Sequence, residues 1–155
     1  MAQLTYTAGD ATQPTGQGPK VITHVCNDIG KWGRGFVMAL SRRWPETRAC
    51  YLEWFGAPDF QLGMVQFVQV EADLWVANLI GQHGIRRRKG DTPVRYPAIA
   101  SGLAKVAAFA SDHGASVHMP RIGAGLAGGD WNTIEQLILD ELVAVGVDTT
   151  VYDLS

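Results

Sequence analysis

The chain lacks the features that would assign it to several specialised classes of protein. Its two cysteines, Cys26 and Cys50, do not form a disulfide framework or a metal site at that spacing, and they predict the reduced thiols of a cytoplasmic protein. No hydrophobic run reaches the length of a transmembrane span, and residues 1–10 lack the basic and apolar regions of a signal peptide. The net charge of −2 argues against general binding to nucleic acid or to anionic membranes. We therefore expect a cytoplasmic protein without a membrane partner.

Length and hydrophobic pattern predict one α/β domain over residues 1–155. A chain of this length with 46% hydrophobic residues can bury its own core. Apolar and β-branched runs predict strands over residues 4–7, 20–26, 63–70, 74–80, 115–119 and 148–154. Helical spacing predicts helices over residues 35–44, 45–55, 97–113 and 131–145. This order predicts a mixed sheet of about six strands with helices on both faces.

Glycine, by contrast, is plentiful, and it gathers in two loops that each follow a predicted strand. One loop is Asn27-Asp28-Ile29-Gly30-Lys31-Trp32-Gly33-Arg34-Gly35, and the other spans residues 120–129 (PRIGAGLAGG). Glycine lets the backbone approach a ligand closely, and a following helix directs free N–H groups and the positive end of its dipole toward it. Two such loops predict a diphosphate held from both sides. The alternative is tight turns without a ligand.

The second loop also matches the G-x-G-x-x-G pattern of dinucleotide-binding folds, through Gly123, Gly125 and Gly128. In a Rossmann domain that pattern lies on the first βα turn and is followed by further βα units. Only one predicted helix and one predicted strand follow it here. The sequence therefore argues against a Rossmann domain.

Polar residues also stand where the first two predicted strands end. Asn27 follows residues 20–26, where its amide could hold a ribose hydroxyl or simply begin an Asx turn. Asp10 follows the first strand, where its carboxylate could accept from an adenine amino group while the Ala11 N–H donates to the ring. Trp32, in the first glycine-rich loop, could form a wall of the site.

Among the four histidines, His83 is the one that we expect near the site, because it follows the strand over residues 74–80. Its imidazole suits acid–base chemistry or a ribose contact, and a solvated loop residue is the alternative. His24 and His118 lie within predicted buried strands, and we expect both to be structural.

With these residues in view, the chain resembles the macrodomains, three-layer α/β/α modules that bind ADP-ribose, over nearly its whole length. Gly9-Asp10 resembles the family's adenine-binding pair, and Asn27 resembles the asparagine that contacts the distal ribose. Residues 33–37 and 122–129 resemble the two phosphate loops. The run over residues 119–131 (MPRIGAGLAGGDW) is similar to the branch that includes the terminal ADP-ribose protein glycohydrolase and the ADP-ribose 1''-phosphate phosphatase.

The resemblance implies ADP-ribose as ligand, ADP-ribosylated proteins as partners, and no cofactor or metal. We also expect a monomer. The residues expected to contact ADP-ribose are Asp10, Ala11, Asn27, Trp32, Gly33, Arg34, Gly35, Phe36, Val37, Gln82, Ile122, Gly123, Ala124, Gly125, Leu126, Ala127, Gly128 and Tyr152.

The chain departs from this branch at two positions. By register, Gln82 and Ala127 stand where the glycohydrolase has a lysine and an aspartate, so the covalent lysine mechanism is not inherited. Lys31 and Lys89 could replace that lysine only through a different geometry. We therefore expect hydrolysis by a bound water, with Asn27, Asp28 and His83 as the catalytic candidates.

The expected activity is hydrolysis of mono-ADP-ribosyl esters on acidic side chains of proteins. One alternative is a non-catalytic ADP-ribose binder, which Gln82 and Ala127 favour, and another is an ADP-ribose 1''-phosphate phosphatase. A nucleic-acid module that uses the basic cluster at residues 86–89 is disfavoured by the acidic overall charge.

Overall fold

The computed structural model describes residues 1–86 and 90–154, apart from the side chain of Leu126. Lys89, and with it most of the basic cluster at residues 86–89, lies outside the described residues. Six strands form one sheet in the order β1-β6-β5-β2-β4-β3. They are β1 (Leu4–Ala8), β2 (Lys20–Asn27), β3 (Val65–Glu71), β4 (Leu74–Gln82), β5 (Ser116–Met119) and β6 (Thr149–Asp153).

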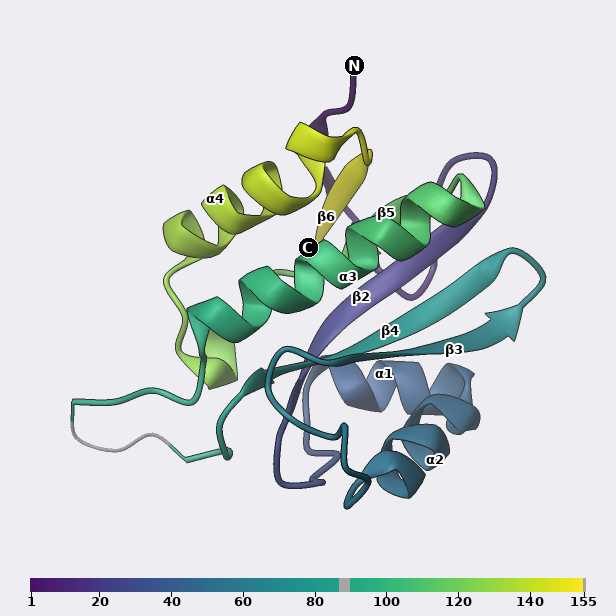
Figure 1. Ribbon diagram of the computed structural model, residues 1–155. Helices are drawn as coiled ribbons and strands as arrows, with labels where there is room; N and C mark the ends of the chain where they lie inside the picture. The colour runs from purple at the N-terminus through teal and green to yellow at the C-terminus, as the bar shows by residue number, and fades with distance from the viewer. Residues whose placement is uncertain (87–89, 155) are drawn as a thin grey trace.

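Neighbouring strands are parallel except β3 and β4, which form an antiparallel hairpin. The helices are α1 (Phe36–Arg43), α2 (Pro45–Trp54), α3 (Tyr96–His113) and α4 (Trp131–Glu141). Figure 1 shows α1 and α2 on one side of the sheet and α3 and α4 on the other. The predicted three-layer α/β/α fold with a mixed six-stranded sheet is therefore confirmed.

Strand β2 explains why the sheet is covered on both faces. Successive side chains of a strand point to opposite faces. Val21 accordingly packs in the core beneath α3 and α4, whereas Ile22 packs with Leu40 of α1 and with Trp44. A strand buried on both sides has a nearly continuous apolar sequence, which is the pattern of residues 20–26.

The last helix ends earlier than the sequence predicts. We expect a helix through Val145, but α4 stops at Glu141 and a short 3-10 turn, η2 (Val143–Val145), follows. Gly146 then adopts a left-handed conformation with φ of 95°, and the N–H of Val147 donates to the carbonyl of Leu142. This tight turn buries both Leu142 and Val147 before β6 begins, which a continued α-helix would not do.

The parallel strands give the molecule one functional edge. Because β1, β2, β4, β5 and β6 run in the same direction, their carboxyl ends lie along one side of the sheet, where ligands bind in open α/β folds. Both glycine-rich loops leave the sheet at this edge. None of the helices in the described residues combines the length and apolar character needed to cross a membrane.

Candidate functional site

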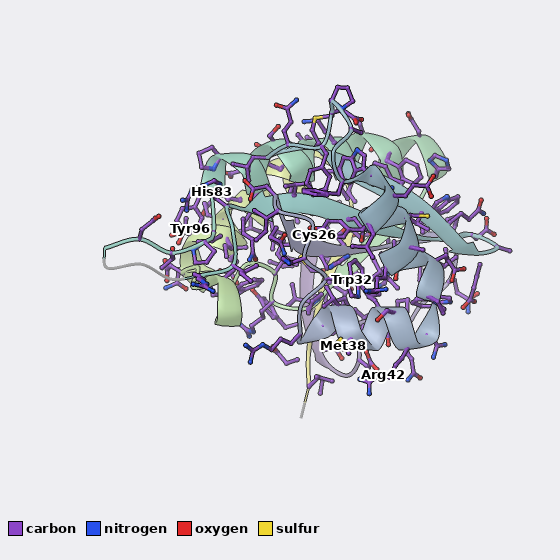
Figure 2. The ribbon with its side chains drawn as sticks, turned by 90° about the horizontal axis from the view of Figure 1, so that it is seen from below. Cys26, Trp32, Met38, Arg42, His83 and Tyr96 are labelled. Carbon is purple, nitrogen blue, oxygen red and sulfur yellow. The ribbon has the colours of Figure 1, made fainter. Side chains whose placement is uncertain are left out.

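A cavity of about 410 Å³ opens at the carboxyl edge of the sheet, between the two glycine-rich loops. Its size is within the usual range of small-molecule sites. In the view of Figure 2, Cys26 and Trp32, which both line it, lie near the centre of the molecule. The expected ligand contacts among its lining residues are Asn27, Trp32, Gly33, Arg34, Gly35, Phe36, Val37, Gln82, Ile122, Gly123, Ala124 and Ala127.

The first loop is organised by the side chain of Asn27. Its Oδ1 accepts hydrogen bonds from the backbone N–H groups of Ile29 and Lys31, each at 3.1 Å, and its Nδ2 donates to the carbonyl of Lys31 at 2.6 Å. The buried Tyr51 hydroxyl lies 2.9 Å from the same Oδ1, and burial raises the pKa of this phenol, so it stays a donor. Asn27 thus forms the Asx turn considered from the sequence while it lines the cavity.

The second loop packs against the helix behind it. A Cβ added to Gly129 would lie 2.4 Å from the carbonyl oxygen of Gly123, so glycine is required at position 129. Asp130 caps α4 by accepting a hydrogen bond from the Thr133 N–H at 3.2 Å. Ile122, Gly123 and Ala124 are the part of this loop that faces the cavity, together with Ala127 from the 3-10 turn η1 (Gly125–Ala127).

Arg121 also lines the cavity, and the sequence-based prediction missed it. Its Nε and one terminal nitrogen donate to the two carboxylate oxygens of Asp153 at 2.6 and 3.0 Å. Its guanidinium carbon lies 5.2 Å from the ring centre of Tyr6 and 5.1 Å from that of Trp131. These hydrogen bonds raise the pKa of Arg121 and lower the pKa of Asp153. The signal available in the sequence was its place in the Met119-Pro120-Arg121 run.

Asp28 and His83 come together, beside the cavity rather than in its lining. The two side chains lie 2.7 Å apart, from Oδ2 of Asp28 to Nδ1 of His83, and Oδ1 of Asp28 accepts from the Gly84 N–H at 2.8 Å. The His83 side chain is 63% exposed. This pair joins the loop after β2 to the loop after β4, and Figure 2 shows His83 to one side of Cys26 and Trp32.

The expected adenine contacts, Asp10 and Ala11, and the expected ligand contact Tyr152 also lie outside the lining of the cavity. Oδ1 of Asp10 accepts from the N–H and the hydroxyl of Thr12, both at 2.8 Å, and Ala11 is buried. The Tyr152 hydroxyl lies 2.7 Å from Nδ1 of His118. The Gly9 N–H donates to the carbonyl of Asp153 in β6. This hydrogen bond brings Asp10 close to the residue whose carboxylate binds the Arg121 side chain. The remaining expected contacts outside the lining are Gly125, Gly128 and Leu126, whose side chain is not described.

The floor of the cavity is uncharged. His24 and Cys26 both line it, and burial lowers the pKa of His24 to about 4 and raises the pKa of the Cys26 thiol. Nε2 of His24 is bound to the side-chain oxygen of Asn78, which fits the structural role expected from the sequence. Within residues 1–86 and 90–154, no three histidine, cysteine or acidic side chains gather as metal ligands.

Gln82 and Ala127 both face the cavity, so the two departures from the glycohydrolase pattern fall at the site itself. Nε2 of Gln82 donates to the carbonyl of Gly84 at 2.9 Å. Lys31 is the one lysine among the described residues that line the cavity, and it is exposed. At the position where the glycohydrolase has its lysine, this chain therefore has a neutral amide, which is hydrogen-bonded within the loop after β4.

Comparison with solved structures supports the assignment of this fold. The chain is 54% identical to a protein of unknown function from Bacteroides thetaiotaomicron, with a TM-score of 0.96 over 99% of both chains. It is 52% identical to a macrodomain protein from Streptomyces coelicolor, with a TM-score of 0.88 over 99% of this chain and 100% of that one. Thermosipho africanus DarTG in complex with ADP-ribose is 17% identical, with a TM-score of 0.69 over 85% of this chain and 37% of that one, and shares the fold alone.

The curated relatives differ in how much of their length they share. The chain is 33% identical to the chromodomain-helicase-DNA-binding protein 1-like of Mus musculus, over 96% of this chain but 17% of that protein. It thus spans only a small part of the first relatives that it matches. An ADP-ribose 1''-phosphate phosphatase of Meyerozyma guilliermondii is 23% identical, over 95% of this chain and 98% of that protein. No protein-family model matches the chain.

Proposed function

The chain belongs to the macrodomain family, and from this we propose that it binds ADP-ribose and hydrolyses mono-ADP-ribosyl esters on acidic side chains of proteins. The observation that carries the proposal is one cavity of about 410 Å³ between two glycine-rich loops at the carboxyl edge of the sheet. A solved structure with this fold, DarTG, is a complex with ADP-ribose.

In this proposal, the two loops hold the diphosphate. Residues 33–37 approach it from one side, where the first turn of α1 offers free N–H groups, and residues 122–124 approach it from the other. The adenine lies toward Arg121 and Asp10, and the distal ribose lies toward Asn27 and Gln82. Asn27 Nδ2 uses one of its two hydrogens on the Lys31 carbonyl, so the other is free to donate to a ribose hydroxyl.

The proposed reaction needs little from the protein beyond positioning. The oxygen of a bound water forms a bond to the anomeric carbon of the distal ribose, and the bond from that carbon to the ester oxygen breaks. The leaving group is a carboxylate, which is a stable anion near neutral pH and takes up no proton. A proton of the water passes to a base, for which the pair of Asp28 and His83 is our candidate. Hydrolysis without a lysine nucleophile is therefore chemically reasonable.

Two other functions have specific observations in their favour. Gln82 and Ala127 at the cavity favour a non-catalytic ADP-ribose binder. The phosphatase of Meyerozyma guilliermondii, which matches over nearly its whole length, favours hydrolysis of ADP-ribose 1''-phosphate.

One assay separates the three functions. The protein is incubated either with an acceptor protein mono-ADP-ribosylated on glutamate or with ADP-ribose 1''-phosphate, and released ADP-ribose is measured by mass spectrometry. We expect release from the ester-linked acceptor, and we expect Asn27→Ala and His83→Ala each to lower the rate about tenfold or more. Release only from the phosphate substrate would favour the phosphatase, and no release from either would favour the non-catalytic binder.

The same assay tests the role of lysine. Borohydride reduces a Schiff base to a stable adduct, and our proposal contains no Schiff base. We therefore expect intact protein mass spectra without an added ADP-ribose after borohydride treatment during turnover. An adduct that disappears in Lys31→Arg would contradict the water mechanism and would identify Lys31 as the nucleophile.

A further inference from the structure

The loops after β2 and β4 meet at one end of the cavity. Asp28 binds both His83 and the backbone of Gly84, at 2.7 and 2.8 Å, so the two loops are held together at this point. Ile29 directly follows Asp28, and Ile85 directly follows Gly84. The two isoleucines are therefore brought to the same rim, and Ile85 also lines the cavity.

Three large apolar side chains at this rim are exposed to solvent. Ile29 is 39% exposed, Ile85 is 48% exposed, and Phe55 at the end of α2 is 51% exposed. Phe55 belongs to the same region, because a Cβ added to Gly30 would lie 2.7 Å from its ring. We call Ile29, Phe55 and Ile85 the rim patch. Exposed apolar side chains that gather beside a ligand site are typical of a surface that binds a partner.

Two cations next to the isoleucines of the rim patch are unpaired among the described residues. Lys31 and Arg86 are exposed, and neither forms an ion pair with another described residue. Both oxygens of the nearby Asp28 carboxylate already accept hydrogen bonds from the neighbouring loop. Beside Ile29 and Ile85, the rim therefore combines aliphatic side chains with two cations that form no ion pair with a described residue.

We propose that the rim patch and these two cations bind the polypeptide segment that carries the ADP-ribose, and that they select an acidic segment with an apolar side chain. This inference rests on the proposed function, in which the distal ribose lies at the end of the cavity near Gln82. The acceptor side chain then leaves the cavity beside Ile85, so the polypeptide has to cross the rim. Opposite charge on the two partners favours encounter and fixes orientation.

The aliphatic part of the rim favours a polypeptide over a nucleic acid. Single-stranded nucleic acids bind mainly by stacking their bases on flat aromatic rings next to a basic groove. Two of the three members of the rim patch are isoleucines, which offer no such face. They pack well against the apolar side chains of a peptide.

The test compares three probes by calorimetry. They are free ADP-ribose and two synthetic peptides that carry one ADP-ribosyl group on a glutamine side chain, flanked either by acidic and leucine residues or by lysines. The amide linkage replaces the ester, so that the probe is not hydrolysed during the titration. We expect the acidic peptide to bind about five- to tenfold more tightly than free ADP-ribose, and the lysine-flanked peptide to have no such advantage. Ile29→Asp and Arg86→Glu should each remove the advantage and leave the affinity for free ADP-ribose unchanged, since neither side chain lines the cavity.

Val145→Asp is the matched control. Val145 is 60% exposed and precedes the amino end of β6, at the opposite edge of the sheet, so this variant should keep the advantage of the acidic peptide. Equal affinity for both peptides and free ADP-ribose would overturn the rim proposal and leave ADP-ribose binding intact. A stronger effect of Arg86→Glu on an ADP-ribosylated oligonucleotide than on the acidic peptide would overturn it in favour of nucleic acid. Failure of free ADP-ribose to bind would overturn the proposed function itself.

Discussion

At the scale of single residues, Arg121 is held at the cavity by two hydrogen bonds and two aromatic rings. Both oxygens of Asp153 accept hydrogen bonds from it, and the rings of Tyr6 and Trp131 lie within 5.2 Å of its guanidinium carbon. A planar group held in this way is ready to contact a ligand without loss of its own freedom. It also lies near Asp10 through the bond from the Gly9 N–H to the Asp153 carbonyl.

Replacement of Arg121 should therefore weaken ligand binding without unfolding the protein. We expect Arg121→Ala to reduce the affinity for ADP-ribose about tenfold or more, as for the loss of a charged hydrogen bond. Arg121→Lys should restore little, because an ammonium cannot reproduce the planar two-point contact. Calorimetry with folded variants tests this. Arg42→Ala, on the exposed face of α1, is the control that should bind normally. Normal binding of ADP-ribose by Arg121→Ala would show that Arg121 has only a structural role, in which it links Asp153 of β6 to the ring of Trp131.

Buried histidines make stability depend on pH. Burial lowers the pKa of both His24 and His118 to about 4, below the value near 6.5 of an unfolded chain. Between these pH values the unfolded chain binds more protons, so the free energy of unfolding falls as pH decreases from about 6.5 toward 4. We expect each histidine to contribute about 1–2 kcal/mol of this loss between pH 7 and pH 5.

Urea unfolding at pH 7 and pH 5 measures the effect. The difference in the free energy of unfolding should be smaller in His24→Gln than in the natural sequence, even though the variant is less stable at both pH values. Ser101→Ala, on the surface of α3, should show the same difference as the natural protein. An unchanged pH dependence in His24→Gln would mean that this imidazole titrates normally in the folded state.

At the scale of elements, the two glycine-rich loops face each other across the cavity and should be equally necessary. Gly33 has room for a side chain, with no atom within 4 Å of an added Cβ, and Ala124 has an extended backbone. Gly33→Glu and Ala124→Glu therefore add a negative charge to each loop without strain. Like charges brought together at a site cost several kcal/mol, so each variant should weaken ADP-ribose binding about a hundredfold or more.

The same change far from the cavity is the control for the loop variants. Ala144→Glu lies on the exposed 3-10 turn η2 near the amino end of β6, and its affinity should equal that of the natural sequence. If only one loop variant lost binding, the diphosphate would be held from one side. Thermal unfolding of each variant ensures that the comparison is between folded proteins.

Most elements of the fold were predictable because their signals are local. The apolar run of β2 and the proline that opens α2 act within a few residues, and the strand and the helix expected at these places are confirmed. The end of α4 was not predictable from its own sequence. Residues 142–145 continue a helical pattern, and the turn at Gly146 forms because Leu142 and Val147 both pack into a core made by other elements.

At the scale of the whole molecule, those parts of the site that a single segment forms could be predicted from the sequence. The parts that form where distant segments meet could not. Most of the expected contacts in the two loops do line the cavity. Arg121 was missed because its role depends on Tyr6, Trp131 and Asp153, which lie far from it in the sequence or on other elements. The contact of Asp28 with His83 likewise joins residues 55 positions apart, and only the parallel arrangement of β2 and β4 brings them together.

The central claim is that the cavity between the two loops binds ADP-ribose by its diphosphate and distal ribose. Titration calorimetry with ADP-ribose and with AMP tests it most directly, because AMP shares the adenosine and one phosphate but lacks the second phosphate and the distal ribose. We predict a dissociation constant for ADP-ribose in the range of about 1 μM, near −8 kcal/mol, and an affinity for AMP at least about tenfold lower. AMP binding as tightly as ADP-ribose, or no binding of ADP-ribose, would contradict the account.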